Sequence, residues 1–384
     1  MGKFVDVLAR SLSRWFPVLD VVLPLLSAFV GSLAPMFSRG KRRGQYNLGD
    51  GVSAMKALVT GGCGFIGSHL VERLVADGHD VRVLDDLSTG RVANIDALVA
   101  SGAVELIQGR VQDPQAAAEA VEGRTHVFHL AALADIVPSI MSPMAYFDTN
   151  VNGTAVILEA ARLAGVEKFL YAASSSCYGI PDEYPTKESA EIRPQYPYAF
   201  TKWAGEETVK HWGQVYGLPY ACLRLFNVYG PRSRTSGTYG AVFGVFLAQK
   251  LAGQPMTIVG DGTQSRDFTF VTDVTAAFTA AAQSDLTSAV MNVGSGGAYA
   301  VNLLAELLGG PTVNIPKRPG EPDVTQADTS RIHTDLGWKP KVPFEQGVEI
   351  MLDNIEYWRD APVWDPEAIA DATALWFDHL GPGK

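Results

Sequence analysis

Cysteine is scarce in this chain of 384 residues. The three cysteines, Cys63, Cys177 and Cys222, are odd in number, far apart and without the spacing of metal ligands. A disulfide framework or a cysteine-rich metal site needs pairs or close clusters of thiols. We therefore expect three reduced core thiols, no bound metal, and a protein of the cytoplasm, where disulfides are rare.

An excess of positive charge is also missing. The 31 Lys and Arg residues are outnumbered by 41 Asp and Glu residues, which gives a formal net charge of -10. Proteins that bind nucleic acid use Lys and Arg side chains to neutralise the phosphates, so this composition argues against a nucleic-acid partner. An anionic small molecule would need a local basic pocket.

A clean membrane-spanning run is lacking as well. The apolar stretch 16–37 is long enough to span a bilayer, but it contains Asp20 and three prolines and has basic residues on both sides. It has no clear small-residue cleavage site. Three interpretations of residues 1–54 stay open: a disordered extension without a part in the fold, an anchor in the membrane interface, or a true span. The second would place the protein at the membrane periphery.

What the chain does contain, from residue 55 onward, is an alternation of strand-like and helix-like segments. Short apolar runs at 56–61, 80–86, 104–109, 126–132 and 168–174 are separated by amphipathic stretches such as 67–78 and 150–165. This alternation predicts an α/β fold with a doubly wound parallel sheet of the Rossmann type. We expect a dinucleotide-binding domain at 55–225. We expect a smaller lobe, mainly substrate-binding, at 226–384, ending in a helix at 365–381 that packs on the main body.

The turn after the first predicted strand is rich in glycine. In "TGGCGFIGSHL", Gly61, Gly64 and Gly67 are three residues apart and enclose Phe65 and Ile66. Glycines allow a tight turn and a close approach of the backbone to a pyrophosphate, which the next helix N-terminus can also bind. The pattern predicts a dinucleotide site.

An acidic residue ends the second predicted strand. Asp85 in "VRVLDD" can accept hydrogen bonds from a ribose diol and would repel a 2′-phosphate, so NAD is favoured over NADP. Asp86 is the weaker candidate.

"YPYAFTK" places Tyr198 and Lys202 four residues apart. On a helix both side chains would lie on one face. A phenol with a pKa of about 10 is a poor base at neutral pH. A nearby ammonium group and a nicotinamide cation would lower that pKa, so the pair predicts an acid/base device.

Six ordered motifs carry a family resemblance: "GGCGFIG", "LDDLSTG", "HLAA", "SSSCYG", "YPYAFTK" and "RLFNVYGP". Over 55–358 the chain resembles the extended short-chain dehydrogenase/reductase family, and within it the nucleotide-sugar epimerases and dehydratases. The resemblance implies Tyr198 as the acid/base, Lys202 as its partner near the nicotinamide ribose, and Ser174 as a catalytic hydroxyl. It also implies a homodimer that pairs helices flanking the Tyr-Lys segment.

The same resemblance implies further cofactor contacts. Ala131 in "HLAA" and Asn150 in "DTNVNGT" match residues near the cofactor, Asn150 at the nicotinamide or its ribose. Arg110 stands where the family usually has an Asp that contacts adenine. Val111 is expected to pack on that ring instead.

The serine run indicates the type of reaction. Dehydratases of the family have an Asp-Glu pair directly after the catalytic hydroxyl, and related decarboxylases have a Glu, but here Ser175 and Ser176 follow Ser174. The residues that remain suit oxidation and re-reduction at one carbon, which is epimerisation. Both serines are expected beside the sugar.

The resemblance also implies the residues that bind the substrate. Arg266 and Arg318 match arginines that clamp the diphosphate, and Asn227 matches a residue beside it. Thr325 falls at a position that gates the sugar C2 substituent, where a small residue leaves room for an N-acetyl group. Ala134 replaces a lysine found in galactose-type epimerases, as in the branch that acts on N-acetylated or uronic sugars.

We therefore predict an NAD-dependent nucleotide-sugar 4-epimerase, an isomerase acting on a UDP-hexose, UDP-N-acetylhexosamine or UDP-uronate in polysaccharide or glycoconjugate synthesis. In this reaction Tyr198 takes the 4-hydroxyl proton, the C4 hydride passes to NAD⁺, and both return to the opposite face of the 4-keto sugar. Two alternatives stay open: another nucleotide-sugar oxidoreductase or dehydratase, and a non-catalytic scaffold that keeps NAD as a structural ligand.

Overall fold

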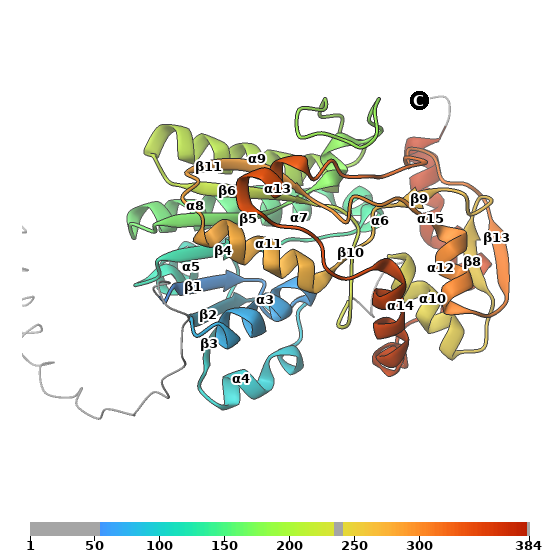
Figure 1. The fold of residues 1–384 in the computed structure, drawn as a ribbon, viewed down its shortest axis with the longest axis horizontal. Coiled ribbons are helices and arrows are strands. Elements are labelled where there is room, and N and C mark those ends of the chain that lie inside the picture. Colours follow the sequence, from blue (N-terminus) through green and yellow to red (C-terminus); the bar gives the residue numbers. More distant parts are fainter. Residues whose placement is uncertain (1–53, 234–240, 382–384) are drawn as a thin grey trace, which may run out of the picture. The chain divides into compact units, whose positions relative to one another are not determined.

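The computed structural model describes residues 54–233 and 241–381. At the centre of this part is a sheet of seven parallel strands in the order β11-β6-β5-β4-β1-β2-β3 (Figure 1). Each strand is a short run rich in apolar residues, as expected for a sheet covered on both faces. Their bounds are β1 Lys56–Thr60, β2 Asp80–Asp85, β3 Val104–Gln108, β4 His126–His129, β5 Lys168–Ser174, β6 Tyr220–Leu225 and β11 Ser288–Val293.

Helices cover both faces of the sheet. Apolar residues of α3 (Phe65–Ala76) and α11 (Val271–Gln283) form one core cluster with one face of the strands. Those of α5 (Pro114–Val121), α8 (Gly153–Leu163) and α9 (Pro197–Tyr216) form a second cluster with the opposite face. The predicted doubly wound α/β fold is therefore confirmed.

The strand order creates a switch point. From β1 the chain adds β2 and β3 on one side, then crosses over and adds β4, β5 and β6 on the other side. The loops after β1 and β4 therefore separate, and open α/β sheets bind ligands in the crevice at such a point. Short helical segments follow three of the strands: η1 Val92–Asn94 and α4 Asp96–Ala100 after β2, α6 Ile136–Met141, α7 Pro143–Phe147 and the π-helical η2 Asp148–Asn152 after β4, and η3 Ser175–Tyr178 after β5.

A smaller lobe is built around its own aromatic core. The rings of Tyr229, Phe243, Phe268 and Phe344 stack or meet edge to face. The lobe contains two-stranded sheets and helices (Figure 1). The remaining elements after β6 are β7 Val228–Tyr229, α10 Val242–Leu251, β8 Met256–Val259, β9 Ser265–Arg266, β10 Thr269–Phe270, β12 Tyr299–Ala300, α12 Val301–Leu308, β13 Thr312–Ile315, α13 Ser330–Leu336, α14 Phe344–Asp353, η4 Ile355–Trp358 and α15 Pro366–Leu380.

The segment after residue 225 also returns to the central sheet. β11 pairs in parallel with β6, from Ser288 opposite Tyr220 to Val293 opposite Leu225, and α11 packs on α3. The two lobes therefore share this part of the chain. The division at 225 remains a prediction.

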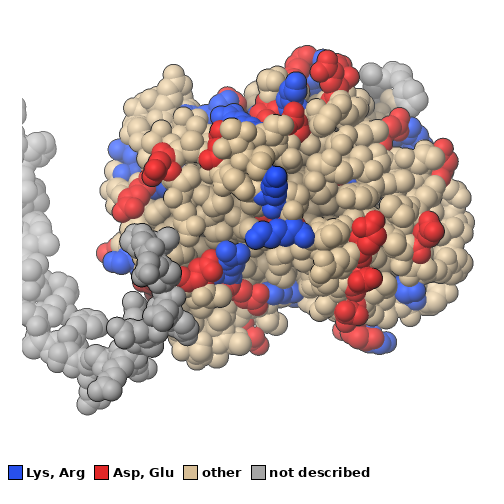
Figure 2. All heavy atoms as spheres, in the orientation of Figure 1, with Lys and Arg blue, Asp and Glu red and all other residues tan. Residues whose placement is uncertain are grey.

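The predicted extension, anchor or span at 1–54 lies, except for its last residue, outside the described residues. Within 54–233 and 241–381, no helix has the length and apolar character needed to cross a bilayer. Figure 2 draws one face of the described part, on which Lys and Arg occur in small groups beside Asp and Glu. This face carries no broad basic surface of the kind that binds nucleic acid.

Candidate active site

A cavity of about 690 Å³ runs along the carboxyl ends of the strands. Its walls come from the loops after β1, β2, β4, β5 and β6 and from the smaller lobe. It lies at the switch point, where this fold binds its ligands. All of the site residues predicted from the sequence line it, with the exception of Asn150.

The glycine turn is as tight as the sequence predicts. Gly61 has a φ of +69°, and a Cβ on Gly67 would lie 2.1 Å from the Gly61 carbonyl oxygen. A side chain at Gly67 would therefore force the turn open. Helix α3 begins at Phe65, so the N–H groups of its first turn, including that of Ile66, have no partner within the helix. The turn fits the pyrophosphate of a dinucleotide.

Asp85 is held at the end of β2 with its carboxylate at the cavity. One carboxylate oxygen accepts a hydrogen bond from the Cys63 N–H at 2.9 Å and the other accepts one from the Leu87 N–H at 2.9 Å. Burial raises the pKa of Asp85, and the two backbone hydrogen bonds oppose that rise. By contrast, Asp86 accepts from the Ser88 N–H and hydroxyl within its own loop. The position of Asp85 is thus compatible with the predicted ribose contact, which stays a prediction.

The other predicted cofactor residues divide into two groups. Val111 and Ala131 line the cavity, whereas Arg110 pairs with Asp148 at the surface, 3.6 Å away. Asn150 is buried, donates to the Leu133 carbonyl and to Thr201, and accepts from the Leu133 N–H. Asn150 therefore ties the loop after β4 to α9, and the structure gives its side chain a positioning role.

Tyr198 and Lys202 lie on the cavity face of α9, one turn apart. Pro197 begins this helix, where its missing N–H costs nothing. The Lys202 ammonium nitrogen lies 4.4 Å from the ring centroid of Tyr171, and the side chain is buried. One turn further along the same helix, Glu206 is fully buried.

Glu206 forms a buried ion pair with Arg224 of β6. The two hydrogen bonds between guanidinium and carboxylate measure 2.6 and 2.9 Å. Arg224 also donates to the Tyr178 hydroxyl at 2.8 Å, and that hydroxyl donates to Asn292 of β11 at 2.7 Å. Such a network fixes the position of α9 against the sheet, because breaking one partner of a buried pair leaves an uncompensated charge.

The pKa of Tyr198 differs from the sequence-based expectation. Burial raises it, the hydrogen bond with Ser174 opposes the rise, and the charge of Asp135 adds to it. Burial also lowers the pKa of Lys202 to about 7, while Cys222 and Glu206 oppose this. Among the groups of the chain itself, burial therefore outweighs the expected effect of the lysine, because the ammonium group is itself costly to bury.

The serine run continues from β5 into η3. The Ser174 hydroxyl lies 2.8 Å from the Ser176 hydroxyl and accepts from the Ser176 N–H at 3.2 Å. All three serines line the cavity beside Tyr198, and Ser174 bonds to it. No carboxylate stands at the two positions after Ser174, so this part of the site has a hydroxyl and a phenol for proton transfer but lacks the acids expected of a dehydratase.

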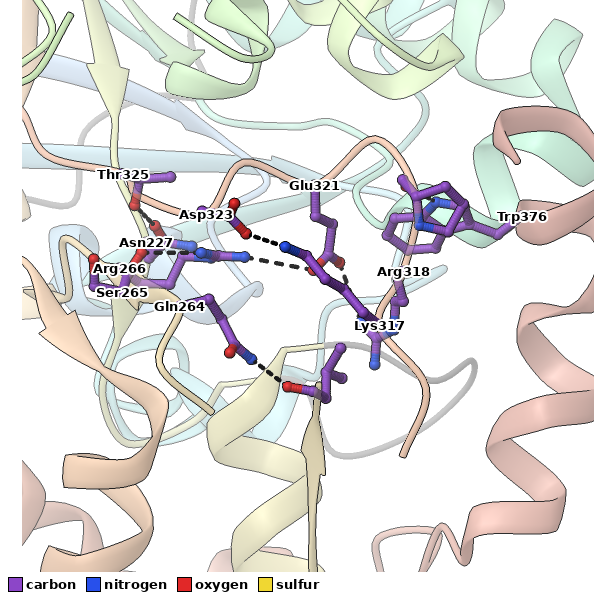
Figure 3. Close-up of polar contacts among 12 residues, drawn as sticks. Asn227, Gln264, Ser265, Arg266, Lys317, Arg318, Glu321, Asp323, Thr325 and Trp376 are labelled. Carbon is purple, nitrogen blue, oxygen red and sulfur yellow. Dashed lines mark hydrogen bonds and ion pairs between the residues drawn. The ribbon is translucent and has the colours of Figure 1, made fainter. Parts of the chain in front are cut away.

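Where the smaller lobe lines the cavity, two arginines share one carboxylate (Figure 3). Arg266 of β9 lies 3.4 Å from Glu321, and Arg318 lies 3.2 Å from the other oxygen of the same group. Both guanidinium groups are largely buried. Burial lowers the pKa of Arg266, and Glu321 opposes this. This is the local basic pocket that an anionic ligand needs within an acidic protein.

Asn227 and Thr325 lie beside these arginines. The Thr325 hydroxyl donates to the Asn227 side-chain oxygen at 3.0 Å and accepts from the Asp267 N–H at 3.0 Å. Both residues line the cavity. The four substrate residues predicted outside the serine run are thus brought together from three segments of the chain.

The cavity is also lined by residues that were not among the predicted site residues. Glu321, Tyr196 and Trp376 line the same space, but no motif or spacing singles them out. "YPYAFTK" contains Tyr196, but its motif indicates only the later tyrosine and lysine. Trp376 belongs to the predicted C-terminal helix, and the sequence indicates only that it packs on the main body.

The described residues contain no group of His, Cys, Asp and Glu arranged to hold a metal ion. The three cysteines are free and buried, and burial raises the pKa values of Cys63 and Cys177 to about 12. These thiols are therefore unreactive at neutral pH.

Comparison with known proteins shows the family to which this chain belongs. Residues 57–294 match the model of the NAD dependent epimerase/dehydratase family. The chain belongs to this family. NAD is accordingly its cofactor, and the glycine turn and Asp85 fit that molecule.

Relatives within this family share most of the chain. It is 37% identical to the UDP-glucose 4-epimerase of Mycolicibacterium smegmatis, over 80% of this chain and 99% of the relative. The UDP-N-acetylglucosamine 4-epimerase of Methanobrevibacter ruminantium M1 is 32% identical, with a TM-score of 0.75 over 80% of this chain and 99% of its own. The UDP-glucuronic acid 4-epimerase of Bacillus cereus is 30% identical, with a TM-score of 0.74 over 79% and 99%.

Proposed function

We propose that this protein is an NAD-dependent 4-epimerase of a UDP-linked sugar. The observation that carries the proposal is the convergence of Ser174, Tyr198 and Lys202 on one cavity, with Ser175 and Ser176 where a dehydratase has acids. The similarity to three 4-epimerases of different UDP-sugars supports the same activity.

In the proposed reaction, side chains of this protein take one proton from the sugar and later return it. The Tyr198 phenol oxygen takes the proton of the sugar 4-hydroxyl and later returns it, so it acts as base and then as acid. Ser174, which bonds to Tyr198, passes or orients that proton. NAD, when bound, supplies the hydride acceptor and donor for C4.

We propose that the UDP part binds where the smaller lobe lines the cavity. Arg266 and Arg318 offer planar donors that suit a diphosphate, and Asn227 lies next to them. Thr325 leaves room at the sugar C2 position for an N-acetyl group. On that basis UDP-N-acetylhexosamines are included among the substrates.

A substrate panel tests this function. The protein is incubated with NAD⁺ and UDP-, GDP- and dTDP-linked glucose, N-acetylglucosamine and glucuronic acid, and the products are identified by mass spectrometry and sugar analysis. The expected result is a 4-epimer of at least one UDP-sugar with no net change in absorbance at 340 nm. Turnover of UDP-glucose without any turnover of UDP-N-acetylglucosamine would reject the role assigned to Thr325.

The same panel separates the alternatives. Net consumption of reduced cofactor indicates another nucleotide-sugar oxidoreductase, and loss of water from the sugar indicates a dehydratase. Bound NAD without any product identifies a scaffold that keeps the cofactor as a structural ligand.

We further infer a homodimer in the cytoplasm that serves polysaccharide or glycoconjugate synthesis. The three free cysteines suit a reducing compartment. Large apolar side chains are exposed on helices near the Tyr-Lys segment, namely Met144, Phe147, Leu163, Phe200 and Val215. Such a surface suits the pairing of two subunits. Light scattering coupled to gel filtration tests the dimer, because a single-chain mass would reject it.

A further inference from the structure

The C-terminal helix α15 contributes a side chain to the cavity. The helix begins after Asp365, whose carboxylate caps the Ala368 N–H at 2.8 Å, and Ile369 anchors it in the core of the smaller lobe. It also packs on α6, near the loop after β4. Trp376 lies further along the helix, is only 3% exposed, and lines the cavity.

Trp376 holds the turn that carries Arg318 (Figure 3). Its indole N–H donates to the Pro319 carbonyl at 2.8 Å, and the Arg318 guanidinium lies 5.5 Å from its ring centroid. Leu380, one turn later on α15, faces Gly320 of the same turn, since a Cβ on this glycine would lie 3.7 Å from it. Three consecutive residues, 318–320, are therefore held by one helix.

The same indole also reaches toward the reacting end of the cavity. The Tyr196 ring centroid lies 6.5 Å from that of Trp376, and Tyr196 in turn stacks on Tyr198 at 6.5 Å with an interplanar angle of 7°. The indole thus lies between the cation expected to bind phosphate and the tyrosine expected to transfer the proton.

We propose that α15 is part of the substrate site and that Trp376 is a positioning residue for Arg318, holding its guanidinium where the diphosphate of the nucleotide sugar binds. An indole face attracts a guanidinium and restricts its motion, which preorganises it for an anion. The inference rests on the proposed function, because it takes a nucleoside diphosphate as the ligand.

Two substitutions separate the π face from simple packing. Trp376→Phe keeps an aromatic face under Arg318, and Trp376→Leu keeps apolar packing without one. UDP binding to the NAD-loaded protein is measured by calorimetry, which needs no turnover. We expect Trp376→Leu to weaken UDP binding about tenfold and Trp376→Phe by about threefold or less. NAD binding should stay unchanged, since the contacts of Trp376 described above are with Pro319, Arg318 and Tyr196 and not with the glycine turn or Asp85.

Phe377→Ala is the matched control, because this neighbouring aromatic ring of the same helix is 37% exposed. It should bind UDP like the wild type, and thermal melting should show that all variants are folded. Equal UDP affinity of Trp376→Leu and Trp376→Phe, or an equal loss in Phe377→Ala, would overturn the proposal.

A second comparison covers the case in which Trp376→Leu does not fold. Trp376→Phe and Phe377→Ala are then compared with Arg318→Gln, and a Trp376→Phe protein that binds UDP as weakly as Arg318→Gln also overturns the proposal. A wild-type protein that binds no UDP would instead reject the proposed function.

Discussion

At the scale of single residues, the site depends on how a few polar groups respond to burial. Lys202 is buried and Tyr198 is partly buried in the cavity wall, and removal from water shifts the pKa of each toward the uncharged form. Ser174 opposes the shift at Tyr198 through a hydrogen bond. The tyrosine is therefore held protonated until another charge, supplied with cofactor or substrate, favours its phenolate.

Replacing Tyr198 by Phe removes the group expected to transfer the proton. We expect kcat for epimerisation to fall at least about 100-fold, because general acid–base catalysis contributes about that much or more. NAD content should stay unchanged. Tyr216→Phe, on the exposed end of the same helix, serves as the control. Full activity of Tyr198→Phe would reject the assignment.

The depressed pKa of Lys202 predicts how stability depends on pH. An unfolded lysine stays protonated up to about pH 10.4, whereas the folded one loses its proton above about 7. Between these values the unfolded state binds more protons, so the contribution of Lys202 to the free energy of unfolding rises with pH. The wild type should gain about 1 to 2 kcal/mol relative to Lys202→Met from pH 7.5 to 9, as measured by urea unfolding at a fixed NAD concentration. A constant or shrinking difference would contradict the prediction.

Much of the site could be predicted because its signals are local. The glycines from Gly61 to Gly67 are close neighbours in one loop and the helix that follows it. Tyr198 and Lys202 are close neighbours on one helix. In both cases the spacing in the sequence predicts which groups meet. The contacts of Arg266 with Glu321 and of Trp376 with Pro319 join residues more than 50 positions apart. No periodicity or motif encodes such a contact, so Glu321 and Trp376 could not be found from the sequence.

At the scale of elements, the glycine turn and α3 act as one unit. The turn can close only because Gly67 has no side chain, which lets the Gly61 carbonyl contact the helix directly. The strand, turn and helix therefore form the cradle that the cofactor fits.

Gly67→Ala should remove the cofactor site. The added methyl group would lie 2.1 Å from the Gly61 oxygen, so the turn must open, and we expect protein purified without bound NAD. Gly123→Ala separates this effect from general destabilisation. Gly123 has a φ of +68° with no atom near its would-be Cβ, so the change costs about 1 kcal/mol of backbone strain far from the cavity. The control should retain NAD, which is measured by absorbance after denaturation.

The residues around an apolar run decide whether the run could be predicted as a strand. The five predicted strand runs, from β1 to β5, are each followed by a glycine, small residue or polar turn that marks the strand end. β11, "SAVMNV", has the same character, but it follows helix α11 in the segment after residue 225, where we expected the smaller lobe. β11 pairs with β6, and the preceding helix α11 packs on α3. Both contacts join distant segments of the chain, so the local sequence does not predict them.

At the scale of the whole molecule, the described residues contain the complete sheet, both core faces and the whole set of predicted site residues. A chain that begins at Met55 should therefore keep the melting temperature, NAD content and epimerase activity of the full chain.

Sedimentation of both forms with anionic lipid vesicles tests the membrane interpretations of residues 1–54. Binding by the full chain alone indicates an anchor, and equal behaviour indicates an extension without that role. A truncated chain that lost its fold would show that these residues belong to the structure.

The return of the chain from the smaller lobe to β11 has a practical consequence. A fragment ending at residue 225 would leave the β6 edge open and remove α11 from one core face. The two lobes are therefore not interchangeable modules, and a hybrid made by joining the first half of one epimerase to the second half of another would inherit a mismatched sheet. A change of sugar preference is better sought by exchanging short segments that line the cavity. Residues 318–325 together with α15 are one such set, and the rest of the chain would stay intact.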